Sequence, residues 1–354
     1  MRIFINGRFL TQRTTGIQRF AYQMCLALFR KNVHFEVVMP DSPATVSDIP
    51  FNIIKYGKHS SPLWEQIWLP LFLRKYPDAL LISFSGLGPM FRKSHISTIH
   101  DLSFYVNKRW FSTAYRLMYG TTTPIMAKHC KGLITVSEFS KKEIVRFLDV
   151  DPDKIHVIYN AVSESFTKEG DNSTVQDSRF NEKYLLAVSS LDPRKNFNAL
   201  IEAFRKADLP DYKLYIIGGR QASFAGGSLE GKEDDRVKYL GHVDDAVLKQ
   251  AYRGASLFVY PSLYEGFGIP PIEAMSLSCP VLVSDIDVFK EVYADAAWYC
   301  NPNDTDDIAS KMEMILNPSN TAKVKLKREA GLLQCQKYSW DSSAEKLIQE
   351  FNLI

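Results

Sequence analysis

Residues 257–275 read LFVYPSLYEGFGIPPIEAM. The apolar run Leu257–Tyr260 predicts a buried strand, and Pro261-Ser262 predicts a turn directly after it. Pro270 and Pro271 suit the first turn of a helix, where a missing N–H group costs little. A buried strand, a glycine-containing loop and a helix in this order are typical of the repeating unit of a parallel α/β sheet.

The same alternation extends through the second half of the chain. Short apolar runs predict strands, and apolar residues at helical spacing predict helices. The predicted strands are Tyr184–Val188, Lys213–Ile217, Val237–Leu240, Val281–Ser284 and Ala297–Cys300. The predicted helices lie near Asn198–Ala207, Thr321–Tyr338 and Ser342–Phe351.

The first half shows the pattern again. Apolar residues after Gly16 fall on one helical face, and Ser140–Glu143 has the form of a capping box that opens a helix through Phe147. The fold class that we predict is therefore α/β, with two doubly wound parallel-sheet domains. The predicted strands of the first domain are Arg2–Asn6, Val33–Met39, Leu80–Phe84, Ile96–Ile99, Leu133–Val136 and Ile155–Tyr159.

One polar stretch separates the two halves. Residues 163–183 hold few apolar side chains and no periodicity, so we place a linker at 166–182. The first domain is then 1–165 and the second 183–335, and we expect the helix within 336–354 to pack back toward the first domain. In doubly wound sheets ligands lie at the carboxyl ends of the strands, so we expect the site between the two domains.

Composition limits the class of protein. With 354 residues, 45% of them hydrophobic and 23% charged, the chain has the mix of a soluble globular protein. No apolar run approaches the ~20 residues that span a bilayer, and the N-terminus is too short an apolar stretch for a signal peptide. Five scattered cysteines argue against a disulfide framework and against a zinc site, and favour the reducing cytosol.

Charge is distributed unevenly. Residues 1–170 carry a net charge of +9, and residues 171–354 carry −6. Such asymmetry predicts that the first half meets an anionic partner, which could be nucleic acid, a phosphorylated lipid or a membrane surface. The alternative is that the two halves attract each other.

The strongest candidate site follows Tyr260. Glu265 lies in the predicted loop and Glu273 in the first predicted helical turn, and free amides at that helix start favour an anion. Two carboxylates beside amide donors suit a ligand that carries hydroxyls and phosphates. Arg194 and Lys195 follow another strand, where two adjacent cations fit a diphosphate. The alternatives are an ordinary turn with a capping Glu and a solvated loop.

Weaker signals lie in the first half. Gly16 opens a helix and could approach a phosphate, while His100 and Asp101 end a strand where a ligand would bind. No GxGxxG string occurs, which counts against a nicotinamide enzyme. The DxD strings at 149–151, 151–153 and 285–287 are interpreted as turns and caps, so no metal site is predicted.

A basic, aromatic stretch contains Lys108, Arg109 and Trp110. Aromatic rings with cations suit the water–lipid boundary and also single-stranded nucleic acid. A core helix whose cations reach the solvent is the alternative. The acidic second half and the absence of nucleic-acid motifs argue against nucleic acid.

The segment from Glu265 to Met275, with Pro280-Val281 after it, resembles the carboxylate-x7-carboxylate signature of retaining glycosyltransferases of family 4, also called group 1. Further strings occur in that family's order over nearly the whole chain. They include Ile99-His100-Asp101, Ser137–Ser140, Tyr159-Asn160, Arg194–Asn196, Ile217–Gly219 and Leu240-Gly241. The resemblance implies the GT-B fold, with two Rossmann-like domains: an acceptor-binding domain first and a nucleotide-sugar-binding domain second.

The resemblance also implies a role for each matching residue. The amide of Gly16 would lie near the donor phosphate, His100 beside Asp101 would orient the donor sugar, and Glu265 would hold sugar hydroxyls. Arg194 and Lys195 would bind the diphosphate, and the family needs no metal or other cofactor. The remaining implied donor contacts are Gly266, Phe267, Gly268 and Ile269 by their loop, Glu273 to the ribose, Tyr239 and Leu240 to the base, and Ser189, where the family often has Gly.

The donor, the acceptor and the location are also expectations. Resemblance of Asn6–Thr11 and Thr15–Phe20 to bacterial surface-polysaccharide enzymes favours mannosyl transfer from GDP-mannose to a lipid-linked glycan, as in O-antigen, capsule or exopolysaccharide synthesis. A dTDP-rhamnose or UDP-sugar donor stays open, as does a non-catalytic two-lobed binding protein. We expect a cytoplasmic protein on the inner face of the cell membrane, with Arg19, Lys108, Arg109 and Trp110 on its acceptor or membrane side.

Overall fold

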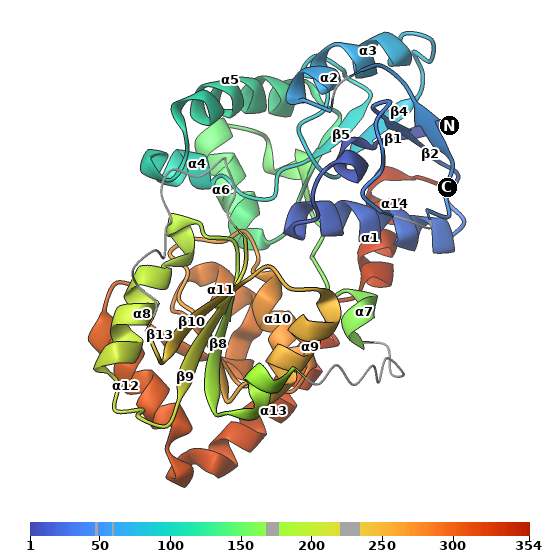
Figure 1. The fold of residues 1–354 in the computed structure, drawn as a ribbon. Helices are drawn as coiled ribbons and strands as arrows, with labels where there is room; N and C mark the ends of the chain where they lie inside the picture. The colour runs from blue at the N-terminus through green and yellow to red at the C-terminus, as the bar shows by residue number, and fades with distance from the viewer. Residues whose placement is uncertain (47–48, 59, 168–176, 220–233) are drawn as a thin grey trace. The chain divides into compact units, whose positions relative to one another are not determined.

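A computed structural model describes residues 1–46, 49–58, 60–167, 177–219 and 234–354. Its internal contacts divide the chain into two compact units, which we name unit 1 and unit 2 (Figure 1). Unit 1 comprises Met1–Val106, Thr113–Asn160 and Ser339–Ile354, and unit 2 comprises Asn107–Ser112 and Ala161–Tyr338. Each unit contains one parallel sheet, so the predicted α/β fold class is confirmed.

The sheet of unit 1 has seven strands in the order β3-β2-β1-β4-β5-β6-β7, and every neighbouring pair is parallel. The strand order reverses between β1 and β4, because the chain builds outward from β1 in one direction and from β4 in the other. The strands are β1 (Ile3–Asn6), β2 (Glu36–Met39), β3 (Ile53–Lys55), β4 (Leu80–Ser83), β5 (His95–Thr98), β6 (Gly132–Thr135) and β7 (Ile155–Val157).

Helices bury the apolar strands of this sheet. Phe4 of β1 is fully buried in a cluster that includes Trp64 of α2 (Pro62–Gln66) and Phe72 of α3 (Trp68–Leu73). Helix α1 (Gly16–Arg30) packs beside α14 (Trp340–Phe351) (Figure 1). The remaining helical segments of unit 1 are η1 (Arg8–Thr11), α4 (Ser103–Val106), α5 (Thr113–His129), α6 (Glu138–Leu148) and η3 (Pro152–Lys154).

Unit 2 contains a six-stranded parallel sheet in the order β10-β9-β8-β11-β12-β13. Its order reverses between β8 and β11. Figure 1 shows α8 (Phe197–Lys206) and α12 (Thr305–Leu316) on one side of this sheet, with α9 and α10 on the other. The strands are β8 (Tyr184–Val188), β9 (Lys213–Ile217), β10 (Val237–Gly241), β11 (Leu257–Tyr260), β12 (Val281–Ser284) and β13 (Trp298–Cys300).

Unit 2 contains further helical segments. The α-helices are α7 (Glu164–Thr167), α9 (Asp245–Gly254), α10 (Ile269–Ser276), α11 (Asp287–Tyr293) and α13 (Thr321–Cys335). The shorter 3-10 segments are η2 (Lys108–Trp110), η4 (Ser178–Asn181), η5 (Pro193–Lys195), η6 (Ala294–Ala296) and η7 (Pro318–Asn320).

The predicted strands are confirmed, with small shifts at their ends, but one predicted helix start is wrong. Helix α6 begins at Glu138, and the hydroxyl of Ser137 caps it by accepting the N–H of Ser140 at 3.0 Å. Ser140 therefore lies inside the helix rather than at its cap. Residues 168–176 of the linker predicted at 166–182 lie outside the described residues.

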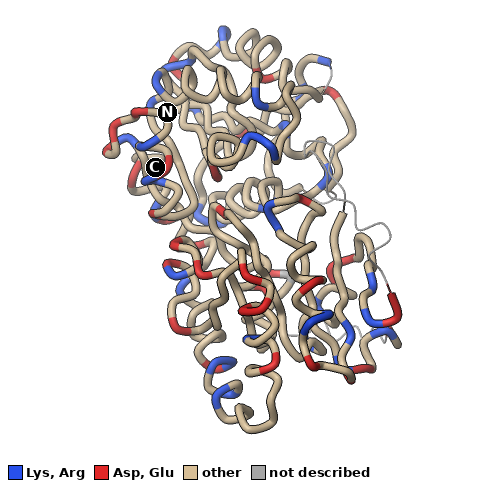
Figure 2. Tube along the Cα trace, turned by 90° about the vertical axis from the view of Figure 1, so that its left-hand side faces the viewer, with Lys and Arg blue, Asp and Glu red and all other residues tan. Residues whose placement is uncertain are grey.

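The return of α14 to unit 1 redistributes the charge. Unit 1 carries 20 Lys and Arg against 14 Asp and Glu, a net charge of +6, and unit 2 carries −3. Asp341 of α14 pairs with Arg30 at 2.9 Å, and Glu345 pairs with Lys31, so part of the basic excess is neutralised within unit 1. Figure 2 shows acidic and basic residues interspersed along unit 2.

Two general expectations about the chain can be compared with the structure. Cys25, Cys130, Cys279, Cys300 and Cys335 are all buried free thiols, which agrees with the absence of a disulfide framework. None of the helices in the described part of the chain is both long enough and apolar enough to cross a membrane.

Candidate functional site

The point where the strand order of unit 2 reverses brings two loops together. One loop follows β8 and carries Arg194 and Lys195, and the other follows β11 and carries Glu265. The N–H of Leu263 donates to the carbonyl of Arg194 at 2.7 Å, which ties the two loops to each other. Ligands of doubly wound sheets bind at such a reversal, so this is the candidate site of unit 2.

Arg194 is oriented by the carboxylate of Asp192. Asp192 caps η5 by accepting the backbone N–H of Arg194 at 2.9 Å, and its other oxygen accepts the Arg194 Nε–H at 2.7 Å. The Asp192 side chain is fully buried. The guanidinium also lies 5.7 Å from the centre of the Phe111 ring, within reach of a cation–π contact. Arg194 is thus held in one orientation before any ligand arrives.

Lys195 and Glu265 form a buried ion pair. The Lys195 Nζ lies 2.5 Å from a carboxylate oxygen of Glu265 and donates to the Tyr260 hydroxyl at 3.0 Å. Burial alone would lower the pKa of Lys195, but the Glu265 carboxylate reverses that effect and the pKa is raised. Burial, together with Glu265, raises the pKa of Tyr260 to about 12. At neutral pH the group therefore consists of an ammonium and a neutral phenol beside the glutamate.

The loop after Glu265 requires glycine at one position. Gly268 has φ +91°, and a Cβ there would lie 2.2 Å from the Tyr293 hydroxyl, which donates to the Gly268 carbonyl at 2.6 Å. Helix α10 starts at Ile269, so Pro270 and Pro271 remove two of the amides that a helix N-terminus normally offers. The two prolines leave this helix start with fewer amide donors than a helix N-terminus normally offers, as their placement in the first turn implies.

Glu273 lies deeper in α10 than the sequence indicated. It is the fifth residue of the helix, past the first turn, and its carboxylate accepts the Tyr252 hydroxyl at 3.1 Å. Its exposed fraction is 5%, and that of Glu265 is 7%. Both side chains are therefore buried, and each has its own partner: Tyr252 for Glu273 and Lys195 for Glu265.

The predicted base contacts Tyr239 and Leu240 lie on β10, and the predicted donor contact Ser189 follows β8. The Ser189 N–H donates to Ile217 at 3.0 Å. Tyr239 of β10 donates its hydroxyl to the Gly218 carbonyl at 2.6 Å, and Leu240 follows it on the same strand. These residues share the carboxyl edge of the sheet with the Arg194 and Glu265 loops.

Two predicted site residues of unit 1 follow β5. The His100 Nε2 lies 2.9 Å from the Phe84 carbonyl, which can only accept, so Nε2 carries the proton. Burial lowers the pKa of His100, and the neutral ring keeps Nδ1 as an acceptor. Asp101 accepts hydrogen bonds from the N–H and the hydroxyl of Ser103, at 2.9 and 2.6 Å. These two bonds fix the turn into α4.

Gly16 and Arg19 belong to the first turn of α1. Gly16 is the first residue of the helix, after the cap Thr15, whose N–H donates to the Gln18 side chain at 3.2 Å. The backbone N–H of Arg19 donates to the Thr15 carbonyl at 2.9 Å. The predicted position of Gly16 at a helix start is therefore confirmed.

Trp110 does not lie on an acceptor or membrane surface, because its side chain is buried. Lys108 and Arg109 beside it are exposed. The neighbouring aromatic rings pack on one another, with Tyr115 and Tyr119 stacked at 4.3 Å between centroids. This arrangement agrees with the alternative of a core segment whose cations reach solvent.

The rejected DxD strings serve local structure. Asp151 caps η3 by accepting the Asp153 N–H at 3.0 Å, and Asp285 pairs with Lys290 at 2.6 Å. Across the described ranges, no group of three or more His, Cys, Asp or Glu side chains is placed to hold a metal ion.

Sequence reasoning missed three partners in the site of unit 2. Asp192 precedes a proline and accepts from the residue two positions on, which is a recognisable capping pattern. Tyr260 ends a buried strand and Tyr252 lies on an amphipathic helix, and neither position signals a polar role. Their hydroxyls are identified only by the structure.

Two doubly wound units, with buried charged groups where the sheet order of unit 2 reverses, define a GT-B glycosyltransferase architecture. The model of Glycosyl transferases group 1 matches residues 171–330, and that of Glycosyltransferase Family 4 matches residues 14–166. The chain therefore belongs to the group 1 glycosyltransferases, also called family 4.

Known proteins agree with this assignment. The chain is 33% identical to O-antigen chain mannosyltransferase RfbU of Salmonella typhimurium, over 77% of this chain and 75% of that protein. It is 29% identical to O-antigen chain mannosyltransferase B of Escherichia coli, over 80% and 76% of the two chains. Its fold is similar to that of sucrose-phosphate synthase from Thermosynechococcus elongatus, with a TM-score of 0.77 at 18% identity over 99% and 98% of the chains.

Proposed function

We propose that this glycosyltransferase is a retaining mannosyltransferase that transfers mannose from GDP-mannose to a lipid-linked glycan during O-antigen or related surface-polysaccharide synthesis. The similarity to two O-antigen chain mannosyltransferases supports the sugar and the acceptor class. The observation that carries the chemistry is the Lys195–Glu265 pair beside the Arg194–Asp192 pair at the sheet edge of unit 2.

The two cations would stabilise the leaving group. Breaking the anomeric C–O bond places positive charge on the sugar ring and negative charge on the departing diphosphate. Arg194 and Lys195 lie in a buried environment, where fixed charges stabilise a developing anion most strongly. In the proposed retaining reaction the acceptor attacks from the face that the diphosphate leaves, and a phosphate oxygen takes the acceptor proton. Glu265, held by Lys195, would orient the sugar rather than bond to it.

Thermal melting with nucleotides tests the donor. GDP should raise the melting temperature more than UDP, dTDP or ADP, because a ligand that binds only the folded state stabilises it. GDP-mannose should then support sugar transfer to a lipid-linked glycan. A larger shift with UDP or dTDP would replace GDP-mannose by a UDP-sugar or dTDP-rhamnose. Nucleotide binding without any sugar transfer or donor hydrolysis would favour the non-catalytic binding protein.

Transfer should be independent of metal ions. In this proposal the guanidinium of Arg194 and the ammonium of Lys195 neutralise the diphosphate without a metal ion. EDTA should therefore leave turnover unchanged. The measurement is initial rate with and without chelator, followed by addition of Mg²⁺ or Mn²⁺. A complete loss that either metal reverses would contradict the proposed role of Arg194 and Lys195.

We also propose that unit 1 associates with an anionic membrane surface. Leu63, Ile67 and Leu71 are exposed by 65%, 50% and 37% at a spacing of four residues across α2 and α3. Exposed Arg74 and Lys75 follow this stripe directly. An apolar stripe beside cations suits insertion at the boundary of an anionic bilayer.

Vesicle binding tests the membrane proposal. Replacing Leu63 and Ile67 by Ser should weaken binding to anionic vesicles, and added salt should weaken it further because exposed charges are screened. Leu326 and Leu333 of α13 are exposed by 65% and 64%, so replacing both by Ser is the matched control. Equal binding to neutral and anionic vesicles, or loss of binding only in the control, would contradict the proposed surface.

A further inference from the structure

The orientation of His100 depends on a carbonyl group just beyond the end of β4. The His100 Nε2–H donates to the Phe84 carbonyl at 2.9 Å, and Phe84 directly follows Ser83, the last residue of β4. The Phe20 ring of α1 packs edge-on against the His100 imidazole, with 5.0 Å between the ring centres. The backbone at Phe84 therefore decides which nitrogen of the imidazole carries the proton and which stays an acceptor.

The loop after Phe84 is built around buried polar side chains. Gly86 has φ +76°, and a Cβ there would lie 2.1 Å from Glu65 Oε1. Gly88 has φ +66°, and a Cβ there would lie 2.5 Å from the Ser83 hydroxyl oxygen. Both positions combine a left-handed backbone with a very close approach, which only glycine permits. The path of the loop is therefore set by where the Glu65 and Ser83 side chains lie.

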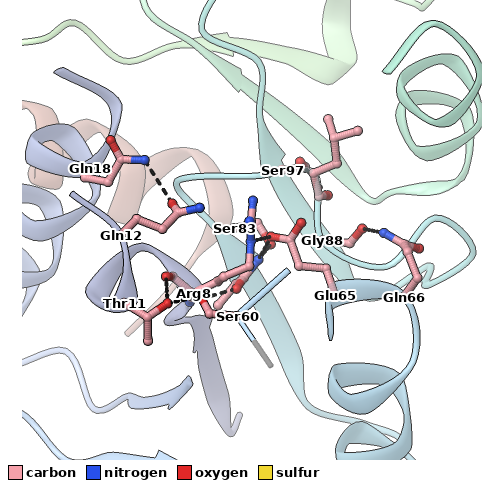
Figure 3. A network of polar contacts seen from close by, with 12 residues as sticks. Arg8, Thr11, Gln12, Gln18, Ser60, Glu65, Gln66, Ser83, Gly88 and Ser97 are labelled. Atoms are coloured by element: carbon pink, nitrogen blue, oxygen red, sulfur yellow. Dashed lines mark hydrogen bonds and ion pairs between the residues drawn. The ribbon is translucent and has the colours of Figure 1, made fainter. Parts of the chain in front are cut away.

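Asn6, Glu65 and Ser83 form a set of buried polar contacts that we name the loop network. The Asn6 Nδ2 group donates to Glu65 at 2.7 Å and to the Ser83 hydroxyl at 3.3 Å (Figure 3). His95 Nε2 lies 3.0 Å from the same hydroxyl, and the Arg8 Nε lies 3.2 Å from a Glu65 oxygen. The exposed fraction of each of these five residues is 5% or less. The contacts join β1, β4, β5 and α2 at the base of the loop.

Two further side chains fix the far end of the loop. The Gln66 side chain donates to the Gly88 carbonyl at 2.7 Å, and the Ser97 hydroxyl donates to the Leu87 carbonyl at 3.1 Å (Figure 3). A loop that is bonded at its far end and packed on a buried carboxylate at its base is held in one position. The Phe84 carbonyl is therefore oriented before any ligand arrives.

We propose that the loop network positions His100 for sugar transfer. Its three side chains hold the loop after β4, and the Phe84 carbonyl fixes the tautomer and the orientation of the imidazole. This inference rests on the proposed function, with His100 in the sugar-orienting role that the family resemblance implies. With Nε2–H held by Phe84, Nδ1 is the ring atom that accepts a hydrogen bond from a sugar hydroxyl. Asn6, Glu65 and Ser83 are positioning residues, which act through His100 and not on the substrate.

The alternative is that the loop network only stabilises the fold. Glu65 is paired with Arg8, and a buried ion pair is weak support for stability, because apolar residues of similar volume often replace it at no cost. The two explanations differ in what they predict for His100. A network that only stabilises unit 1 would lower the melting temperature when it is altered and leave the His100–Phe84 hydrogen bond intact.

Hydrogen exchange of the His100 Nε2–H proton, followed by NMR on the full-length protein without substrate, tests the proposal. The signal is assigned by its absence in His100→Gln. Glu65→Gln and Ser83→Ala should each accelerate exchange at least tenfold, because exchange requires the hydrogen bond to the Phe84 carbonyl to open. Both variants should also lower kcat at least tenfold, with less than a threefold change in the donor KM, because the proposed nucleotide contacts lie in unit 2.

Arg92→Gln is the matched control. Arg92 donates to the backbone carbonyls of Ser94 and Tyr76, at 3.2 and 3.3 Å, and it precedes β5 in the same unit. Its loss should lower the melting temperature while exchange at His100 and kcat each change less than twofold. Ser83→Ala leaves no buried charge unpaired, so it decides the question if Glu65→Gln does not fold.

Four results would overturn the proposal. They are an unprotected Nε2–H proton in the wild-type protein, unchanged exchange in the loop-network variants, equal acceleration in Arg92→Gln, and faster exchange with normal kcat. The exchange rates are measured without donor or acceptor. The absence of sugar transfer by the wild-type protein would therefore reject the proposed function, while the exchange rates would still show whether the loop network orients His100.

Discussion

Lys195 and Glu265 show how a single residue pair combines stability with chemistry. Each charge neutralises the other in a buried environment, at 2.5 Å between Nζ and the carboxylate. Removing one partner leaves a buried charge uncompensated, which costs about 3–5 kcal/mol. Activity and stability are therefore coupled at this position, and a single substitution cannot separate them.

A double-mutant cycle separates the two effects. Lys195→Met and Glu265→Gln should each destabilise the protein by about 3 kcal/mol, whereas the double variant should lose less than the sum, since no buried charge is left unpaired. Turnover should stay low in all three, with Lys195→Met losing about 2–4 kcal/mol of barrier stabilisation. Urea unfolding and steady-state rates are the measurements. Additive stability losses would show that the two residues do not interact, and recovery of turnover in the double variant would show a structural role only.

The buried His95 should make the stability of the protein depend on pH. Burial lowers its pKa from the usual 6.5 to about 3. Between these values the unfolded chain binds a proton at His95 that the folded chain does not, so the free energy of unfolding decreases as the pH is lowered, by up to about 1.4 kcal/mol per pH unit. His95→Gln should remove that contribution, and urea midpoints at pH 7 and pH 5 measure it. The exposed His34→Gln is the control. An unchanged pH slope in His95→Gln would contradict the assignment.

Sequence identified the charged residues of the site better than their partners. Arg194, Lys195 and Glu265 stand out because they follow predicted strands, at the edge where doubly wound sheets bind ligands. The pairing of Lys195 with Glu265 spans 70 positions, and local patterns carry no information about such a distance. Trp110 was placed wrongly because an aromatic residue beside two cations gives the same pattern whether its ring is buried or exposed.

At the scale of elements, burial decided which segments were predictable. Strands such as β8, β11 and β12 have every side chain buried, so each is a continuous apolar run. Strand β3 was missed because it is an edge strand of three residues that are only partly buried or exposed. Helices α2 and α3 were missed because each is short and their exposed leucines interrupt the helical periodicity.

Three glycines differ in how well their surroundings would tolerate a side chain. Gly218 directly follows β9, and a Cβ there would lie 1.6 Å from the Ser189 carbonyl oxygen, so Gly218→Ala should prevent folding of unit 2 or cost more than about 3 kcal/mol. Gly241 has open space but φ +69°, so Gly241→Ala should cost about 1–2 kcal/mol. Gly120 lies inside α5 with nothing within 4 Å, and Gly120→Ala should stabilise by about 0.5–1 kcal/mol. Urea unfolding decides the order, and any other ranking would contradict this explanation.

At the scale of the whole molecule, the chain crosses between units more than once. The C-terminal residues Ser339–Ile354 belong to unit 1, where Trp340 packs edge-on against Phe20 with 5.7 Å between ring centroids. Phe351 fits against Gly132 of β6, where any Cβ would meet its ring at 2.5 Å. The expectation that the helix within 336–354 packs back toward the first domain rests on no local pattern, because contacts between the first and last elements of the chain leave none.

Deletion of Ser339–Ile354 tests the dependence of unit 1 on α14. The deletion removes the fully buried Leu347, exposes Phe20, and leaves Arg30 and Lys31 without their acidic partners, so unit 1 should melt at a lower temperature or fail to fold. Unit 2 keeps all of its strands and the Lys195–Glu265 pair, so nucleotide should still shift a melting transition while transfer is lost. Substitution of the exposed C-terminal residue, Ile354→Ser, is the control. Loss of the nucleotide-dependent shift in the truncated protein would show that unit 2 cannot bind its donor without an intact unit 1, and full activity would show that α14 is dispensable.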